Sequence, residues 1–344
     1  MWSRFAALPP YFGGKRQLCP VIFKAISGHL PQADWPRMTL VDAFCGGGAV
    51  SLYAKAQGMR VLANDLAERS KVIMDALIAN DRVTIGEEDV YRLFVDGAAS
   101  DHFVEQSFVP EMFMQRHAAF IDRAMASITQ IEHRTKARLL KLLLIRYMFA
   151  VTPYSQIHSV NYHRWIENEE FHRLGMSRTK KVPYTAMHPL RILMSDKDKI
   201  NRGVFPNGHR NEAYQEDVFE FLARAEGDIC YLDPPYAGAQ AYEKFYEVLD
   251  QILAGQRQEL TLSEFNLEQA KVLLGRLLEA SRKFRVVIVS YGSQRYPFEE
   301  FQELVRRIEP QATCMQLQYR YTMASKGFTE QLRKELLAVI THGA

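Results

Sequence analysis

The chain has 344 residues, of which 47% are hydrophobic and 24% charged, with a formal net charge of +3. It can bury a large core in about two domains, and its composition is that of an ordinary soluble globular protein. No apolar run approaches the roughly eighteen residues of a membrane span and no secretory signal opens the chain, so we expect a cytoplasmic protein without a membrane partner. The four cysteines stand singly, without CxxC pairs, which argues against a disulfide framework and against a metal site.

The segment at residues 9–15 reads Pro-Pro-Tyr-Phe-Gly-Gly-Lys and precedes a predicted helix over residues 16–30. A Gly-Gly turn lets the backbone approach a ligand closely, and the following Lys15 adds one cation beside it. A plain loop is the alternative interpretation of this segment.

Residues 39–57 predict the first unit of a doubly wound parallel sheet. A buried strand over residues 39–44 leads through a glycine turn at residues 45–48 into a helix over residues 49–57. The ligand of such a sheet lies off the carboxyl ends of the strands.

A second predicted strand, residues 60–65, ends in Asp65 and is followed by an apolar-periodic helix. An acid at this tip is where nucleotide-binding sheets hydrogen-bond ribose hydroxyls, so Asp65 is a candidate ribose ligand. The alternative is a simple helix N-cap, a role that Asn64 could share.

Residues 81–210 lack this alternation of strand and helix. A strong helix is predicted over residues 131–151, and residues 133–210 hold fifteen Lys or Arg against five Asp or Glu, a local net charge of +10. Cations mixed with aromatic residues suit contacts to nucleic-acid phosphates and bases, with a merely solvated surface as the alternative. The candidate DNA-binding residues are Arg138, Arg146, Tyr154, Arg164, Arg178, Lys180 and Lys181.

The sheet pattern resumes at residues 213–222, a strand end that runs into a helix, and continues with a buried strand at residues 229–232. The sequence Asp-Pro-Pro-Tyr, residues 233–236, follows that strand directly. Two prolines remove two backbone donors and force the chain out of the sheet. A carboxylate, a carbonyl oxygen and an aromatic ring are thereby left at the end of the strand; an exposed β-turn is the alternative interpretation.

This set of groups suits an exocyclic amino group. If the Asp233 carboxylate and the Pro234 carbonyl accept its two hydrogens, the nitrogen lone pair becomes available for attack. Tyr236 would hold the base by its face, a contact worth roughly 1–3 kcal/mol.

Downstream, a helix is predicted from residues 262–271 onward to residue 280, with Ser263 or Asn266 as its cap. A further buried strand is predicted at residues 284–291. The alternating stretches 313–322 and 332–341 predict a terminal hairpin.

In content and order these segments resemble the Dam-type, or alpha-group, adenine-N6-specific DNA methyltransferases, from residue 9 to the C-terminus except in the middle region. The resemblance implies an α/β fold: a doubly wound, Rossmann-like methyltransferase sheet with a C-terminal antiparallel hairpin. Residues 1–80 and 211–344 would form the catalytic core. Residues 81–210 would form an inserted, mainly helical DNA target-recognition domain.

The resemblance also implies S-adenosyl-L-methionine as the cofactor and assigns residue roles. Asp233, Pro234 and Tyr236 would be catalytic, and Lys15 would contact the methionine end of the cofactor. Asp217, with Glu216 as its competitor, would lie near the cofactor's adenine. The implied cofactor-binding residues are Tyr11, Phe12, Gly14, Lys15, Asp42, Phe44, Gly46, Gly48, Asp65, Asp217 and Asp233.

The implied activity is site-specific methyl transfer to the N6 amino group of an adenine flipped out of duplex DNA. A cognate restriction endonuclease is a candidate partner, and a monomer or weak dimer is expected. The middle region departs from Dam: Val-Thr-Pro-Tyr stands at residues 151–154 in place of the expected Phe-Asn-x-Pro run, so recognition of GATC does not carry over. The alternatives are an RNA adenine or protein amide methyltransferase, or an inactive DNA-binding regulator.

Overall fold

The structure, a computed structural model, describes residues 1–95, 100–110, 112–152, 187–235, 242–259, 263–266, 269–292, 297–323 and 329–343. Seven strands in this part of the chain form a mixed sheet in the order β3-β2-β1-β4-β5-β7-β6. They are β1 (Thr39–Asp42), β2 (Arg60–Asn64), β3 (Glu212–Tyr214), β4 (Ile229–Leu232), β5 (Val286–Gly292), β6 (Thr313–Met323) and β7 (Thr329–Thr341).

Strands β1 to β5 are parallel to one another, and β7 runs antiparallel between β5 and β6. The strand order reverses direction between β1 and β4, which places a topological switch point, the usual ligand crevice of such sheets, above these two strands. The predicted doubly wound sheet and the predicted C-terminal hairpin are both confirmed.

The sheet is buried on both faces because successive apolar residues of a strand point to opposite faces of the sheet. In β5, Val286 and Ile288 join one core, and Val287 and Val289 join the other. The first core is shared with helices α2 (Cys19–Ser27), α3 (Ala49–Ala56) and α4 (Glu68–Ile73). The second is shared with helices α12 (Val218–Arg224), α14 (Ala270–Ala280) and α15 (Phe298–Ile308).

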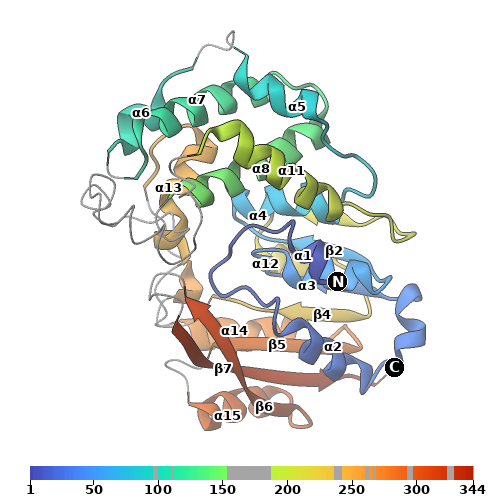
Figure 1. The fold of residues 1–344 in the computed structure, drawn as a ribbon. Coiled ribbons are helices and arrows are strands. Elements are labelled where there is room, and N and C mark those ends of the chain that lie inside the picture. The colour runs from blue at the N-terminus through green and yellow to red at the C-terminus, as the bar shows by residue number, and fades with distance from the viewer. Residues whose placement is uncertain are drawn as a thin grey trace.

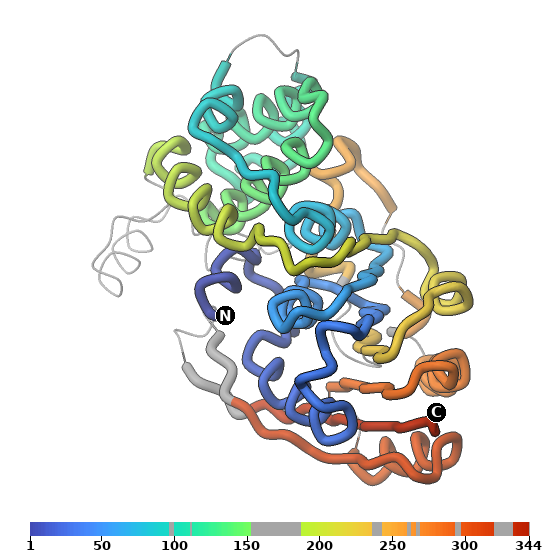
Figure 2. The backbone as a smooth tube through the Cα atoms, turned by 90° about the vertical axis from the view of Figure 1, so that its right-hand side faces the viewer, coloured from blue at the N-terminus to red at the C-terminus, as the bar shows by residue number. Residues whose placement is uncertain are grey.

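The described residues between 81 and 210 form helices and no strand, as the mainly helical insertion was predicted to do. They are α5 (Glu87–Tyr91), the 3₁₀ turn η3 (Arg92–Phe94), α6 (Phe103–Phe108), α7 (Gln115–Thr129), α8 (Arg134–Val151) and α11 (Pro189–Arg202). Figures 1 and 2 show this group stacked to one side of the sheet in two perpendicular views. Helix α8 packs against α4, and their apolar residues belong to one continuous core.

The remaining elements are α1 (Trp2–Phe5), η1 (Gln32–Arg37), the π-helical turn η2 (Met74–Ile78), α13 (Tyr242–Ala254) and the 3₁₀ turn η6 (Glu264–Asn266). The helix predicted from residues 262–271 is divided in the structure: Ser263 Oγ accepts a hydrogen bond from Phe265 N in the η6 turn, and α14 begins only at Ala270. Within the described residues, no helix has the length and apolarity needed to cross a membrane.

Candidate active site

A cavity of about 970 Å³ lies at the carboxyl ends of β1, β2 and β4, at the switch point of the sheet. Its lining brings together most of the predicted cofactor residues, which come from widely separated parts of the chain: Tyr11, Phe12, Gly14, Lys15, Asp42, Phe44, Gly46, Asp65, Asp217 and Asp233. Gly48 does not line it. Gly48 instead precedes α3 with φ +77°, and a Cβ there would lie 2.9 Å from Ile73 Cγ2.

The glycine loop after β1 is shaped around Tyr11. A Cβ added to Gly47 would lie 2.6 Å from Tyr11 Cβ, and one added to Gly46, whose φ is +52°, would lie 3.1 Å from the Tyr11 ring. The Tyr11 ring stacks on Tyr246 of α13 at a centroid distance of 5.1 Å. The sequence predicts that these glycines let the backbone approach a ligand closely. In the structure they also leave room for the side chain of Tyr11.

The N-terminal loop is held by α13 as well. The hydroxyl of Tyr246 accepts a hydrogen bond of 2.7 Å from Phe12 N, and the Phe12 ring stacks on Phe245 at 4.4 Å. Gly13 has φ +74°, and Gly14 N donates to Tyr11 O, which closes a tight turn directly before Lys15. The predicted ligand loop is therefore ordered by aromatic contacts that the sequence did not indicate.

Asp42 lies at the end of β1 and is fully buried. Ser51 Oγ donates to its Oδ2 at 2.6 Å, whereas Oδ1 has no hydrogen-bond partner within the described residues. Burial raises the pKa of Asp42 to about 7. An orphaned buried carboxylate oxygen at a cavity wall suits a ligand that brings its own cationic donor, such as the ammonium group of an amino acid.

Asp65 connects two loops at the tip of β2. Its Oδ2 accepts from Gly46 N at 2.7 Å and its Oδ1 accepts from Ala67 N at 2.9 Å, which ties the glycine loop to the start of α4. Asn64 is buried and bonds both backbone polar groups of Glu216, so it secures the neighbouring loop. At the tip of β2, the carboxylate that lines the cavity is therefore that of Asp65.

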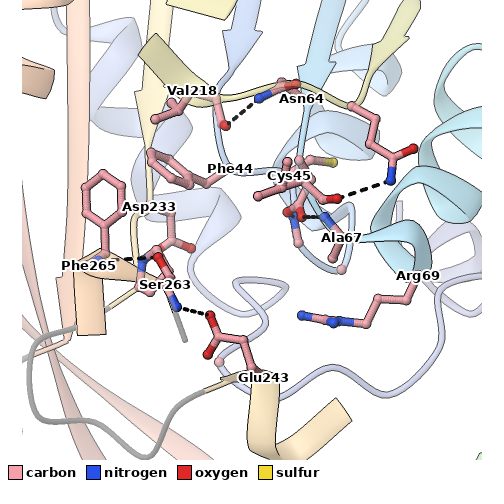
Figure 3. A pocket seen from close by; sticks show the side chains of 18 of the residues that line it. Phe44, Cys45, Asn64, Ala67, Arg69, Val218, Asp233, Glu243, Ser263 and Phe265 are labelled. Atoms are coloured by element: carbon pink, nitrogen blue, oxygen red, sulfur yellow. Dashed lines mark hydrogen bonds between the residues drawn. The ribbon is translucent and has the colours of Figure 1, made fainter. Parts of the chain in front are cut away.

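The far end of the cavity is aromatic, and Figure 3 shows Phe44, Val218 and Phe265 gathered there. Phe44 and Phe265 meet edge to face with centroids 5.4 Å apart, and Phe219 lies parallel to Phe265. Phe265 was missed in the sequence because its segment is typical of the first turn of a helix. Such an end suits a flat heterocycle.

Asp217 lies beside this aromatic end and caps α12. Its Oδ1 accepts from Phe219 N at 2.8 Å and from Glu220 N. The competing Glu216 carboxylate is instead engaged by the guanidinium of Arg224, whose Nε lies 3.0 Å from Glu216 Oε2. Both acids line the cavity, and the choice between them for the predicted role stays a prediction.

Asp233 follows β4 and reaches the cavity with 18% of its side chain exposed. Lys15 Nζ lies 2.9 Å from Asp233 Oδ1 and 3.1 Å from Glu335 Oε1 of β7. Lys15 was predicted to contact the cofactor, and the structure pairs it with the predicted catalytic carboxylate. The described backbone includes Pro234, whereas Tyr236 lies outside the described residues.

Arg69 forms a second ion pair at the opposite end of the cavity, where Figure 3 shows it on α4 facing α13. Its guanidinium pairs with Asp250 and lies 4.4 Å from the centre of the Tyr246 ring. No local pattern in the sequence indicated this pair, because its members lie on helices far apart in the chain.

Two predicted DNA-binding arginines form ion pairs within the protein. Arg138 pairs with Glu68 and, at 3.2 Å, with Asp75. Arg146 is 11% exposed; it pairs with Asp196 at 3.0 Å and donates to the carbonyl oxygens of Ala7 and Leu8. The other predicted DNA-binding residues lie outside the described residues: Tyr154, Arg164, Arg178, Lys180 and Lys181.

Carboxylates outnumber ammonium and guanidinium groups along the described lining of the cavity. This charge disfavours a ligand with a pyrophosphate and favours one that carries positive charge. Together with the antiparallel seventh strand, the aromatic end and the Asp-Pro-Pro turn, it defines the class of S-adenosylmethionine-dependent methyltransferases that act on amino groups.

Comparison with known proteins identifies the family. The family model of the D12 class N6 adenine-specific DNA methyltransferases matches residues 11–292, and the chain belongs to this family. It is therefore an adenine-specific DNA methyltransferase that uses S-adenosylmethionine, as the resemblance implied.

Two relatives of similar sequence agree with this assignment. The chain is 28% identical over 309 residues to the type II methyltransferase M2.HphI of Haemophilus parahaemolyticus, covering 88% of this chain and 90% of that protein. It is 26% identical to the modification methylase StsI of Streptococcus sanguinis, covering 73% of this chain but 37% of that protein. A methyltransferase structure from Agrobacterium tumefaciens is similar over 96% of this chain and 62% of that one, with 11% identity and a TM-score of 0.38.

Proposed function

We propose that this chain methylates the N6 atom of an adenine that has been flipped out of duplex DNA, at a specific site. The observation that supports this most is the position of Asp233, which directly follows β4 at the switch point and reaches the cavity. Its carboxylate and the Pro234 carbonyl accept the two hydrogens of the amino group, which frees the nitrogen lone pair. Tyr236 stacks on the flipped base and offsets part of the unstacking cost of a few kcal/mol.

The cavity residues would hold the cofactor along its length. Asp42 would accept a hydrogen bond from its ammonium group, and Asp65 would accept one from its ribose. The aromatic end formed by Phe44, Phe219 and Phe265 would enclose its adenine, beside Asp217. When bound, S-adenosylmethionine supplies an electrophilic methyl group whose bond to sulfur breaks as the bond to nitrogen forms.

The remaining residues align the reactants and stabilise charge. The loop that contains Tyr11, Phe12 and Gly14 fixes the wall of the cavity, and Gly46 brings the backbone close to the cofactor. The Asp233 carboxylate stabilises the positive charge that develops on the attacking nitrogen. No metal ion takes part in this scheme.

DNA binding is assigned to the basic part of the insertion, residues 133–210, with its local net charge of +10. The Lys and Arg of this segment other than Arg138 and Arg146 neutralise phosphates, and Tyr154 or Tyr162 fills the space that the flipped base leaves. The relatives are named as type II methyltransferases and modification methylases, which supports a role beside a restriction endonuclease. We assign the chain as a monomer or weak dimer.

Transfer of tritiated methyl groups to duplex DNA, RNA and protein tests the proposal. Duplex DNA is expected to be labelled at adenine N6. Asp233→Ala should lower the rate by about 10³-fold or more, because one acceptor of the amino group is lost, while cofactor binding stays measurable.

Asp34→Ala is the matched control, because Asp34 is a partly exposed carboxylate of η1, paired with Arg37, that does not line the cavity. Its activity should equal that of the unmodified protein. Full activity in Asp233→Ala, or labelling confined to RNA or protein, would overturn the proposal. Failure to bind cofactor at all would favour a DNA-binding regulator.

A further inference from the structure

Behind the Asp233 carboxylate lies a buried chain of polar groups that the proposed mechanism does not use. Lys15 Nζ bridges Asp233 Oδ1 at 2.9 Å and Glu335 Oε1 at 3.1 Å, and it also donates to Gly13 O at 3.3 Å. Ser290 Oγ donates to the same Glu335 oxygen at 2.6 Å. The order from the cavity inward is therefore Asp233, Lys15, Glu335 and Ser290.

Glu335 occupies a position where a carboxylate is costly. It lies in β7 opposite Gly292 of β5, directly before a run of buried apolar residues, and is 3% exposed. It is not part of the cavity wall, so neither DNA nor cofactor in the cavity would touch it. A buried carboxylate at such a position needs compensating partners, and Lys15 and Ser290 supply them.

The charges of the three ionisable groups give Glu335 a specific effect on Asp233. A Lys15–Asp233 pair without Glu335 would carry no net charge. Its ammonium would then weaken the attraction between the Asp233 carboxylate and a positive charge on the substrate. With Glu335 on the other side of Lys15, these three side chains together carry one net negative charge, and the ammonium is shared between two carboxylates. A negative cluster stabilises the positive charge that develops on an attacking amino nitrogen.

We propose that Glu335 is a positioning residue for methyl transfer: it holds Lys15 so that Asp233 keeps both its place and its negative charge toward the substrate amino group. The proposal rests on the proposed function of Asp233. It adds a residue from the C-terminal hairpin, outside the segment that the family model matches.

The test is steady-state kinetics of Glu335→Gln on duplex DNA, with binding of S-adenosylhomocysteine measured by calorimetry. Glutamine keeps the shape of the side chain and its acceptor for Ser290 but removes the charge. We expect kcat to fall about tenfold or more, while KM for the cofactor and the affinity for S-adenosylhomocysteine change less than about twofold.

A double-mutant cycle shows whether Glu335 acts through Lys15. In the Lys15→Met background, Glu335→Gln should have no further effect on kcat, because the ammonium that connects the two carboxylates is gone. Glu303→Gln is the matched control: Glu303 is an exposed acid of α15, paired with Arg307, and should leave kcat unchanged. Additive losses in the cycle would overturn the proposal.

Ser290→Ala covers the case in which Glu335→Gln does not fold. It removes one hydrogen bond and no charge, and we expect kcat to fall about threefold with KM unchanged, because Glu335 is held less firmly. Unchanged kcat in a folded Glu335→Gln protein, or in Ser290→Ala, contradicts the positioning role. If kcat of Glu335→Gln is unchanged and Asp233→Ala is inactive in the same assay, the proposed function stands while this inference fails; if Asp233→Ala is active, both fail.

Discussion

The carboxyl edge of the sheet and helix α8 both carry charged residues that the sequence singled out, yet the two regions use them differently. At the sheet edge, Asp42, Asp65 and Asp233 reach one cavity. On α8, Arg138 and Arg146 face carboxylates of the protein itself. Parallel strands bring their ends to a common edge, so topology concentrates the charges there. A helix distributes its side chains around its axis, and the elements packed on it decide which of them stay accessible.

The largest effect is expected at Asp42, the most buried acid of the sheet edge. Its folded-state pKa of about 7 lies above the ordinary value of 3.8, so stability without cofactor should fall as pH rises from about 4 to 7. At pH 8 the ionised carboxylate costs on the order of 4 kcal/mol, so Asp42→Asn should be more stable than the unmodified protein there and nearer to it at pH 5. Urea unfolding at both pH values measures this.

The same substitution should weaken cofactor binding, because the ammonium group loses its anionic partner. Calorimetry should show a loss of about 1.5–3 kcal/mol, the value of a charged hydrogen bond. Asp34→Asn, at a partly exposed position outside the cavity, should change neither property. An Asp42→Asn protein that is less stable at pH 8 would show that the sheet edge does not concentrate unfavourable charge.

An intermediate effect is expected for Arg146→Gln. The change leaves Lys199 as the remaining ion-pair partner of buried Asp196 in the described structure. It also removes two hydrogen bonds to the backbone of the segment before Tyr11. We expect a loss of about 3 kcal/mol in the free energy of unfolding and little change in DNA affinity of the folded protein.

Arg134→Gln is the control on the same helix, since the Arg134 side chain is 78% exposed. It should change stability by less than about 0.5 kcal/mol. If Arg146→Gln instead weakened DNA binding without loss of stability, α8 would be a DNA-binding surface after all.

The smallest effects are expected when cations in ion pairs within the protein are compared with cations assigned to DNA binding. Replacing Lys180 and Lys181 by Ala should reduce DNA affinity and lower the slope of log K against log salt by roughly one for each phosphate that is no longer neutralised. Arg138→Gln should leave that slope unchanged and cost about 1 kcal/mol of stability at most, because its pairs are partly exposed. Equal slopes for the unmodified protein and both variants would remove the basic segment from DNA recognition.

Much of the fold followed from local sequence signals. Alternating and continuous apolar runs indicated the strands, and the glycine turn with the acid after β2 indicated a ligand at the sheet edge. The helix boundaries were less predictable: the helix expected over residues 131–151 begins at Arg134, and the one expected over residues 16–30 spans Cys19–Ser27. Helix ends depend on capping contacts, which periodicity does not report.

The candidate site was predictable where its residues stand at strand ends and not where it is closed by distant elements. Tyr11 inside the glycine loop, Phe265 against Phe44 and Arg69 against Asp250 each join segments without a shared local pattern. The ion pairs of Arg138 and Arg146 could not be foreseen for the same reason. A sequence shows which cations are present but not which acids will face them.

The sequence by itself determined which segments form strands, the residues at their ends and the chemistry of the Asp-Pro-Pro turn, since these depend on neighbours in the chain. Only the tertiary structure decided which charged side chains form ion pairs within the protein. It also decided that Glu335, near the C-terminus, pairs with Lys15, near the N-terminus. Such pairings arise when β7 inserts beside β5. The low dielectric constant of the interior then strengthens each ion pair and raises the cost of leaving its partners unpaired.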